Sequence, residues 1–223
     1  MKAIAVLLAD DHQIVREGFR SLLGHERDIE VVGEAATGRE AVQLTRKLHP
    51  AVVVMDIAMP LLNGLEAARQ IRKAFPDIRV LILSAHSDDV YIERATELGA
   101  AGFLLKQTSS HVLAQAIREV HKGGTFFCAD ISKRVFRRNP VDRKGNSMKT
   151  GNRLSSRETE VLQMIAEGLP NKKVAVELGV SIKTVDKHRQ HLMGKLDIHD
   201  AAGLTRYAIA EGIIESNVRR KIR

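Results

Sequence analysis

The stretch IAVLLADD (residues 4–11) is an apolar run that ends at two adjacent carboxylates, Asp10 and Asp11. An unbroken apolar run of this length is typical of a strand buried on both faces, whereas a strand with one solvated face alternates apolar and polar residues. Two neighbouring carboxylates repel each other, and a protein keeps such a pair where a positive charge neutralises it. The stretch therefore predicts a buried strand that delivers negative charge to one edge of a sheet.

Short apolar runs of the same kind alternate with helical patterns along residues 1–122. The runs are IAVLLA (4–9), EVVGEA (30–35), AVVVM (51–55), RVLILS (79–84) and GFLL (102–105). Amphipathic segments lie between and after them, with the spacing i, i+3, i+4 and i+7 of a helix at Ala41, Leu44, Thr45 and Leu48 and again at Leu113, Ala116, Ile117 and Val120. Five strands that alternate with five helices predict an α/β fold with a doubly wound five-stranded parallel sheet, covered by helices on both faces.

Polar side chains stand where four of these five strands end. Asp10 and Asp11 follow the first strand, Asp56 the third and Lys106 the fifth, and the fourth ends at Ser84. The carboxyl ends of parallel strands form one edge of the sheet, where α/β proteins bind their ligands. A single Asp at such a place would more simply cap the next helix, but five matched groups predict a site. Three carboxylates there require a cation, and oxygen ligands with room for water suit Mg²⁺.

The charged residues divide the chain into two unlike parts. The chain has 223 residues and a formal net charge of +8. Residues 1–134 carry 17 Lys or Arg and 17 Asp or Glu, whereas residues 135–223 carry 18 and 10. The whole positive excess therefore belongs to the C-terminal part. Such asymmetry predicts a module that binds a polyanion, attached to a neutral module, although a basic surface can also be merely solvated.

The boundary between the two parts is visible in the stretch RRNPVDRKGNSMKTGNR (residues 137–153), where apolar residues nearly vanish. Pro, Gly, Asn and basic residues in such density are typical of an exposed linker. We therefore predict a first domain of residues 1–122 with a C-terminal extension, 123–136, then a linker, 137–152, and a second domain, 153–223.

The composition disfavours several classes of protein. No apolar segment approaches the roughly 20 residues that a membrane-spanning helix needs, and the first residues lack the long apolar region and cleavage site of a signal peptide. We expect a globular, cytoplasmic protein with no membrane partner. The single cysteine, Cys128, cannot form a disulfide within the chain, and no Cys/His cluster has zinc spacing. We expect Cys128 to be a small buried residue.

The second domain is predicted to be small and all-helical. The stretch LSSRETEVLQMIAEGLP (154–170) opens with Ser155 three residues before Glu158, the spacing of a capping box at the start of a helix. A short second helix is expected from about Asn171 to Gly179, and Ser181 can cap a third. Two helices joined by a tight turn that contains Gly form a helix-turn-helix.

The third of these helices, IKTVDKHRQHLMGKL (182–196), is expected to have an apolar and a polar face. The residues expected to pack inward are Val185, His188, Leu192 and Leu196. The polar stripe on the opposite side consists of Thr184, Lys187, His191 and Lys195, flanked by Lys183, Asp186 and Gln190. A polar, mostly basic helix face preceded by a tight turn favours insertion into the major groove of DNA. A solvated surface helix would show the same pattern, but the localised positive charge favours DNA.

Residues 3–122 resemble the flavodoxin-like receiver domains of bacterial two-component response regulators. The motifs that carry the resemblance are the acidic pair, MDIAMPLLNG (55–64), LSAH (83–86) and GAAGFLLK (99–106). The resemblance implies that Asp56 accepts a phosphoryl group from a phosphohistidine of a sensor histidine kinase. The only chemistry it implies is self-phosphotransfer and autodephosphorylation at Asp56, so no separate catalytic residue is expected and the protein is not expected to be an enzyme.

The resemblance also implies roles for the residues around Asp56. Mg²⁺ would be held by Asp11, Asp56 and the backbone carbonyl of Ala58, with Asp10 acting through water. Lys106 would pair with a phosphoryl oxygen, and Ser84 would hydrogen-bond another. Movement of that serine would let Phe103 turn inward and reshape the surface around the fourth and fifth strands. Phe103 could also be a simple core residue.

Residues 153–215 resemble the LuxR-type DNA-binding domain of NarL/FixJ-type regulators, over the whole stretch from LSSRETE to HLMGKL. The resemblance makes Lys187 and Gln190 the better candidates for base contacts, while Thr184 and His188 lie near the DNA backbone or brace the helix. Asp186 is an awkward neighbour for phosphate. It either reads a cytosine amino group or orients Lys187 or Lys183.

The resemblance further implies how the protein assembles on DNA. The fourth helix, DAAGLTRYAIAEGII (200–214), is expected to pair with its copy in a C₂ homodimer formed on phosphorylation. The dimer would bind an inverted repeat in double-stranded promoter DNA, and RNA polymerase is a further partner to consider. The linker would let the receiver obstruct the groove-reading helix until phosphorylation.

The expected function is therefore phosphorylation-controlled transcription regulation, and two alternatives stay open. One is an Asp-nucleophile, Mg²⁺-dependent phosphohydrolase, which also forms an aspartyl phosphate on an α/β sheet. It is disfavoured because Ala58 stands where a second acid would act as general acid, two residues after Asp56. The other is a transcription factor of the same fold that acts independently of phosphorylation.

Overall fold

The computed structural model describes three stretches of the chain, residues 3–85, 88–127 and 154–215. The chain divides into two compact units, Met1–Arg138 and Asn139–Arg223. The predicted linker, residues 137–152, lies outside the described residues, as do Cys128 and most of the predicted extension, 123–136. Every helix in the described part of the chain is too short or too polar to cross a lipid bilayer.

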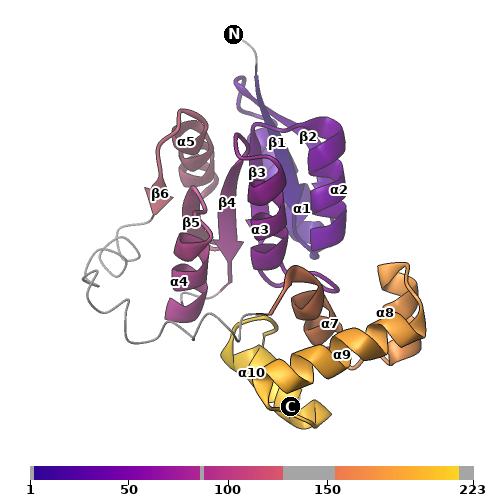
Figure 1. The fold of residues 1–223 in the computed structure, drawn as a ribbon. Helices are drawn as coiled ribbons and strands as arrows, with labels where there is room; N and C mark the ends of the chain where they lie inside the picture. The colour runs from indigo at the N-terminus through magenta and orange to yellow at the C-terminus, as the bar shows by residue number, and fades with distance from the viewer. Residues whose placement is uncertain (1–2, 86–87, 128–153, 216–223) are drawn as a thin grey trace, which may run out of the picture. The chain divides into compact units, whose positions relative to one another are not determined.

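The first unit is built around a parallel sheet in the order β2-β1-β3-β4-β5-β6 (Figure 1). The strands are β1 (Ile4–Ala9), β2 (Ile29–Ala35), β3 (Val52–Asp56), β4 (Arg79–Ser84), β5 (Gly102–Leu105) and β6 (Phe126–Phe127). The predicted doubly wound α/β fold is confirmed. The strand order reverses between β1 and β3, and ligands of such sheets bind at the carboxyl ends of the two strands that flank this point.

The sheet has six strands where the sequence predicted five. The additional strand, β6, pairs with β5 through Gly102↔Phe126 and Phe103↔Phe127. The guanidinium of Arg79 holds the preceding turn, because its Nη2 atom donates to the carbonyl of Gly123 at 2.8 Å. A strand of two residues is too short to show an apolar run or an alternation, which is why the prediction missed it.

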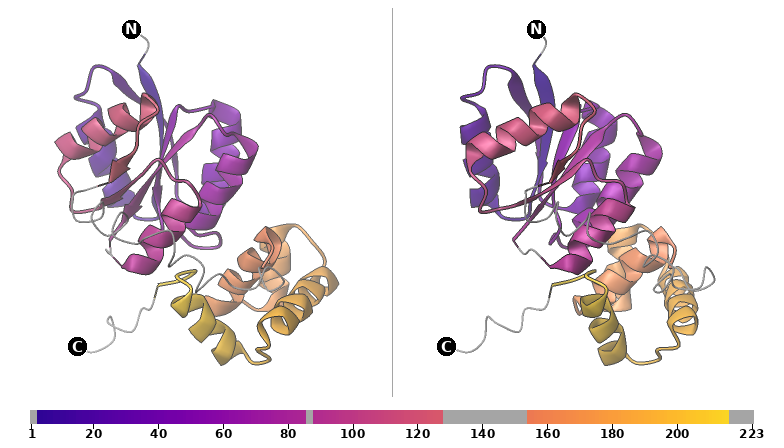
Figure 2. Two further views of the ribbon diagram at one scale, coloured as in Figure 1. Left: turned by 60° about the vertical axis from the view of Figure 1, so that its left-hand side comes forward. Right: turned by 90° about the vertical axis from the view of Figure 1, so that its left-hand side faces the viewer.

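Helices cover both faces of the sheet (Figure 2). One face carries α2 (Gly38–Leu48), α3 (Gly64–Ala74) and α4 (Asp89–Glu97), and the other carries α1 (Gln13–Leu23) and α5 (Ser110–His121). Successive strand residues point to opposite faces, so Leu7 belongs to the buried cluster under α2, α3 and α4, while Val6 and Leu8 belong to the cluster under α1 and α5. Burial on both faces explains why the strands read as unbroken apolar runs.

The described part of the second unit consists of four helices. They are drawn in orange to yellow in Figure 1. They are α7 (Ser156–Ala166), α8 (Asn171–Leu178), α9 (Ile182–Leu196) and α10 (Ala201–Ala210). The predicted capping box at Ser155 and Glu158 is present. Gly179 ends α8 in the left-handed conformation, with φ of 61°, which residues with a Cβ rarely adopt. The tight turn between α8 and α9 is therefore possible, and the predicted helix-turn-helix is confirmed.

Candidate functional site

The carboxylates predicted from the strand ends lie together at one edge of the sheet. Asp56 is the last residue of β3, and Asp10 directly follows β1, which pairs with β3 through Ala9↔Met55. The side-chain ligand atoms of Asp10, Asp11, His12 and Asp56 all lie within 4.8 Å of one another. Asp10 and Asp56 are almost wholly buried, with exposed fractions of 3% and 1%. These two carboxylates thus lie where little water can solvate them, whereas Asp11 and His12 are exposed.

Lys106 supplies the positive charge that faces this cluster. Its Nζ atom lies 2.7 Å from Oδ2 of Asp10 and 2.9 Å from Oδ2 of Asp56. The lysine is fixed in place because its backbone N–H donates to the carbonyl of Ser84 at 2.8 Å. Burial alone would lower the pKa of Lys106, but the attraction of Asp56 and the bonds to both carboxylates outweigh it and raise that pKa. Lys106 is therefore a cation throughout the physiological pH range.

The single positive charge of Lys106 does not balance the negative charges of the three carboxylates. Burial raises the pKa of Asp56 to about 6, and the charges of Asp10 and Asp11 add to this effect, while Lys106 opposes it. Ionising a carboxyl group with such a pKa costs free energy, because the neighbouring carboxylates repel the new negative charge. A divalent cation among the carboxylates would relieve that repulsion, and three carboxylates form the hard oxygen donor set that Mg²⁺ prefers. The residues present therefore fit a magnesium ion, as expected at the acidic site of a receiver.

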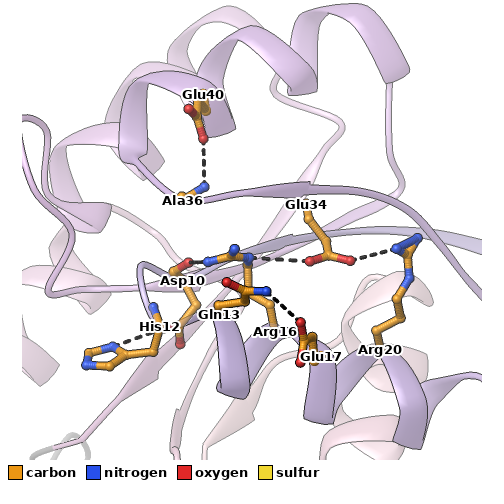
Figure 3. A network of polar contacts seen from close by, with 9 residues as sticks. All are labelled: Asp10, His12, Gln13, Arg16, Glu17, Arg20, Glu34, Ala36 and Glu40. Atoms are coloured by element: carbon orange, nitrogen blue, oxygen red, sulfur yellow. Dashed lines mark hydrogen bonds and ion pairs between the residues drawn. The ribbon is translucent and has the colours of Figure 1, made fainter.

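Arg16 holds the loop that carries the acidic pair (Figure 3). Its Nη1 atom donates to the backbone carbonyl of Asp10 at 2.6 Å, and its Nε atom donates to Oε2 of Glu34 on β2 at 3.3 Å. Arg20 donates to the other oxygen of Glu34 at 2.7 Å. The backbone N–H of His12 donates to Oδ1 of Asp10 at 2.9 Å, which orients that carboxylate. The sequence alone does not indicate this contact, because eighteen positions separate Arg16 from Glu34.

The loop after β3 approaches Asp56 closely. Ala58, whose carbonyl was predicted to bind the metal, is half-buried in this loop. The carbonyl of Ile57 accepts hydrogen bonds from Met59 at 3.0 Å and from Gly64 at 2.9 Å, so the loop is tightly folded. A Cβ atom on Gly64 would collide with the backbone carbonyl oxygen of Asp56. Glycine is therefore required at the start of α3 for the loop to stay beside the phosphoacceptor candidate.

The two remaining receiver candidates lie on β4 and β5. Ser84 ends β4, one residue beyond Leu83, which pairs with Asp56. It is buried, with an exposed fraction of 1%. Phe103 is completely buried in the cluster under α2, α3 and α4. The structure thus brings Ser84 and Lys106 to the edge with the carboxylates and places Phe103 in the core behind them.

The second candidate site is the outer face of α9. The predicted DNA-contacting residues that are exposed are Lys183, Lys187, Gln190 and His191, and Asp186 is exposed among them. The predicted candidates that are half-buried are Thr184, His188 and Lys195. The inward stripe is anchored by Val185 and Leu192, which are completely buried. The exposed face therefore combines Lys187 and His191 of the predicted stripe with the three flanking residues Lys183, Asp186 and Gln190.

Lys195 is engaged within the second unit. Its Nζ atom lies 2.6 Å from Oε2 of Glu158, whose exposed fraction is 4%. Burial would raise the pKa of Glu158, but the bonds from Lys195 and Ser155 lower it. Lys195 therefore neutralises the capping box of α7. Thr184 is likewise engaged, because its Oγ1 atom lies 2.8 Å from Oγ of Ser181 at the start of α9.

Asn171 and Arg189 contact this site, although the sequence did not predict a role for either side chain. Asn171, the first residue of α8, donates from Nδ2 to Oδ1 of Asp186 at 2.6 Å. Its Oδ1 atom accepts a bond from Nη1 of Arg189 at 3.2 Å. Neither contact follows a helical period, because Asn171 lies on a different helix, and only the packing of α8 against α9 brings the three side chains together.

Comparison with known families decides what these two sites belong to. The family model described as "Response regulator receiver domain" matches residues 6–118. The model described as "Bacterial regulatory proteins, luxR family" matches residues 152–208. The chain is a two-component response regulator of the NarL/FixJ type. This response regulator is thus a DNA-binding transcription regulator with a phosphorylation-controlled receiver, rather than an enzyme.

Two similar proteins match this response regulator over almost its whole length. "Oxygen regulatory protein NreC" of Staphylococcus epidermidis is 35% identical over 215 residues, which cover 94% of this chain and 99% of NreC. "Transcriptional regulatory protein DegU" of Brevibacillus brevis is 32% identical over 225 residues and covers 95% of each chain.

Solved structures are similar over almost the whole response regulator. The RcsB response regulator of Salmonella typhimurium has a TM-score of 0.57 and 28% identity, covering 94% of this chain and 100% of that one. RcsB in an RcsB–DNA complex has a TM-score of 0.58 and 27% identity, covering 94% of this chain and 99% of that one.

Proposed function

We propose that Asp56 is the phosphoacceptor of this response regulator. A carboxylate oxygen of Asp56 attacks the phosphorus of a phosphohistidine on a sensor histidine kinase, the P–N bond breaks, and an acyl phosphate forms while the histidine nitrogen leaves with the electron pair. The observation that carries this proposal is the position of Asp56 at the strand switch point, next to Lys106 and between further carboxylates. The protein would act in the cytoplasm, and hydrolysis of its own acyl phosphate would return Asp56 to a carboxylate.

The residues around Asp56 would have separate roles in phosphoryl transfer. Asp11, Asp56 and the backbone carbonyl of Ala58 would hold Mg²⁺, and Asp10 would act through water. The bound ion would neutralise the charge that builds up as phosphoryl oxygens approach the carboxylates. Lys106, now paired with Asp10 and Asp56, would pair with a phosphoryl oxygen once the acyl phosphate has formed.

The change at Asp56 would be read out through β4 and β5. Ser84 would move toward the phosphoryl group and hydrogen-bond one of its oxygens. The core around Phe103 would repack in response, and the surface near α4 would change with it. Ser84 and Phe103 support this route because they stand on adjacent strands, with Phe103 paired to Ile82.

The output would be binding of promoter DNA by α9. Lys183, Lys187, Gln190 and His191 are exposed on one helix face and would meet the major groove. Thr184 and His188 would lie near the DNA backbone, and Lys195 would act through the ion pair that fixes α7 to α9.

The assembly on DNA would be a homodimer formed on phosphorylation. Solved RcsB structures contain dimers bound to DNA. Helix α10 offers an exposed face with Ala202, Arg206 and Ile209 at helical spacing, which a second copy could cover symmetrically. The site would be an inverted repeat. RNA polymerase would be the partner that the bound dimer acts on.

The phosphoacceptor assignment is tested by mapping phosphate on the full chain. We would treat the wild-type chain and Asp56→Asn with a small acyl phosphate and Mg²⁺, and measure intact and peptide masses. One added phosphoryl group on the peptide that contains Asp56, and none on the variant, is the expected result. Equal phosphorylation of both proteins would show that another residue accepts the phosphoryl group. Sustained turnover of small phosphate esters by the wild type would favour the phosphohydrolase alternative.

A further inference from the structure

Asp186 is a negative charge in the middle of a surface that is otherwise suited to DNA. It is exposed on α9 between Lys183 and Lys187, in the fifth position of the helix. Early positions of a groove-reading helix are those that reach base edges. A carboxylate there repels phosphate, so its presence cannot be explained by general attraction to the DNA backbone.

The side chain of Asp186 is held in one orientation by a chain of hydrogen bonds. Asn171 donates from Nδ2 to Oδ1 of Asp186 at 2.6 Å. The orientation of the Asn171 amide is itself fixed, because its Oδ1 atom accepts a bond from the half-buried Arg189 at 3.2 Å. Arg189 can only donate, so the amide oxygen must face it and the amide nitrogen must face Asp186. The bond from α8 therefore orients the carboxylate on α9.

The remaining oxygen of Asp186 can accept but not donate. Asn171 is the only described residue that bonds the Asp186 side chain, and it occupies Oδ1. The lysines on either side do not pair with Asp186 within the described part of the chain. An ionised carboxylate has no proton to give. In the major groove cytosine and adenine both present an amino donor, but adenine places its N7 acceptor beside that donor and repels a carboxylate, so the amino group of cytosine is the better match.

We propose that Asp186 is a specificity-determining residue that accepts a hydrogen bond from the N4 amino group of one cytosine in each half-site. Asn171 and Arg189 are positioning residues that hold its carboxylate for this contact. The inference rests on the proposed binding of DNA by α9 and adds the base that one position of the site must contain. Lys183 and Lys187 then flank the cytosine contact and approach phosphates or guanines.

The test is selection of double-stranded DNA from a random pool by the full chain, with and without the acyl phosphate donor. We expect the wild type to select one position per half-site at which cytosine is favoured by about 5- to 150-fold over the other bases. Asp186→Asn should abolish the cytosine preference at that position, because Asn171 holds the single amide oxygen and leaves the amide nitrogen, a donor, to face the bases. The amide nitrogen repels the amino group of cytosine and is matched by bases that present acceptors, such as guanine. Asn171→Ala should weaken the cytosine preference severalfold without creating one for another base.

Asp197→Asn is the matched control, because it makes the same chemical change at the exposed C-terminal end of α9. It should keep the cytosine preference. The thermal unfolding midpoint of Asp186→Asn should equal that of the wild type, which shows that a lost cytosine preference does not come from a destabilised fold. If Asp186→Asn retained the cytosine preference, or raised affinity equally for all sequences, Asp186 would not read a base. If the wild type selected no sequence at all, the proposed binding of DNA would fail together with this inference.

Discussion

At the edge of the receiver sheet Asp10 and Asp56 are buried and both contact Lys106, whereas on α9 the charged groups are exposed and spread along a helix. Asp56 and Asp10 share one lysine at 2.9 and 2.7 Å in a nearly dry environment. Lys183, Lys187 and Gln190 face solvent. Buried charges interact strongly and individually, while exposed charges are screened and act nearly additively. One region is therefore suited to chemistry at a single atom and the other to graded attraction of a polyanion.

The largest effect should come from removing a carboxylate that does not itself accept phosphate. Asp11→Asn should lower the Mg²⁺-dependent rate of phosphorylation at Asp56 by about 100-fold or more, because the charge that retains the cation is lost. Phosphoprotein formed against time, at several Mg²⁺ concentrations, measures this. Asp77→Asn, an exposed change just before β4, is the control and should react normally. A normal rate in Asp11→Asn would show that the acidic edge does not bind the cation as proposed.

The buried cluster should also make stability depend on pH. Burial and the neighbouring carboxylates raise the pKa of Asp56 to about 6, so without Mg²⁺ the folded chain binds this proton more tightly than the unfolded chain. The extra stability is present below about pH 4 and is lost as pH rises through about 6. It amounts to about 3 kcal/mol at most. Asp56→Asn should lack this component, and Mg²⁺ should reduce it.

The measurement is the difference in free energy of unfolding between wild type and Asp56→Asn, followed from pH 4 to 8 in chelator and in Mg²⁺. The difference between the two proteins cancels the contribution of every other titrating group that the substitution does not perturb. A difference that does not vary with pH would show that burial and the neighbouring carboxylates do not raise the pKa of Asp56.

A smaller effect on stability separates Lys195 from the exposed lysines. Lys195→Met should lower the free energy of unfolding of the second unit by about 1 to 3 kcal/mol, because Glu158 loses its cation while it stays buried. Lys187→Met on the exposed face should change stability by less than about 0.5 kcal/mol. Chemical denaturation monitored by circular dichroism gives both values. Equal effects would mean that the Lys195–Glu158 pair contributes nothing beyond a surface contact.

The smallest effect concerns the salt dependence of DNA binding. Lys187→Ala should reduce the slope of log affinity against log salt by about one, because one phosphate or base contact with counterion release is lost. The affinity of the full chain for a selected DNA site, measured between about 50 and 200 mM salt, tests this. An unchanged slope would place Lys187 outside the interface.

The strands and the acidic edge could be predicted because both depend on local sequence. A strand buried on two faces must be apolar throughout, and the residue at its end must lie at the sheet edge. Five strands therefore agree with the sequence within about two residues, while the two-residue β6 carried too little pattern to detect.

Contacts between distant residues could not be predicted in this way. Arg16 meets Glu34, Lys195 meets Glu158, and Asn171 meets Asp186 only because separate elements pack together. Helical periodicity placed Lys195 on the polar side of α9, at the helical spacing of the predicted stripe. It could not show that the neighbouring helix α7 presents a buried carboxylate to that side of α9.

Phosphorylation at the buried site should control how tightly the exposed face of α9 binds DNA. The most direct test is the affinity of the full chain for its selected DNA, with and without an acyl phosphate donor and Mg²⁺, for wild type and Asp56→Asn. The donor should tighten binding by the wild type by about 5- to 150-fold and leave the variant unchanged. If residues 148–223 alone bound DNA no better than the unphosphorylated full chain, inhibition by the receiver would be wrong. Equal affinity of wild type and Asp56→Asn with the donor present would contradict this control and identify a regulator that acts independently of phosphorylation.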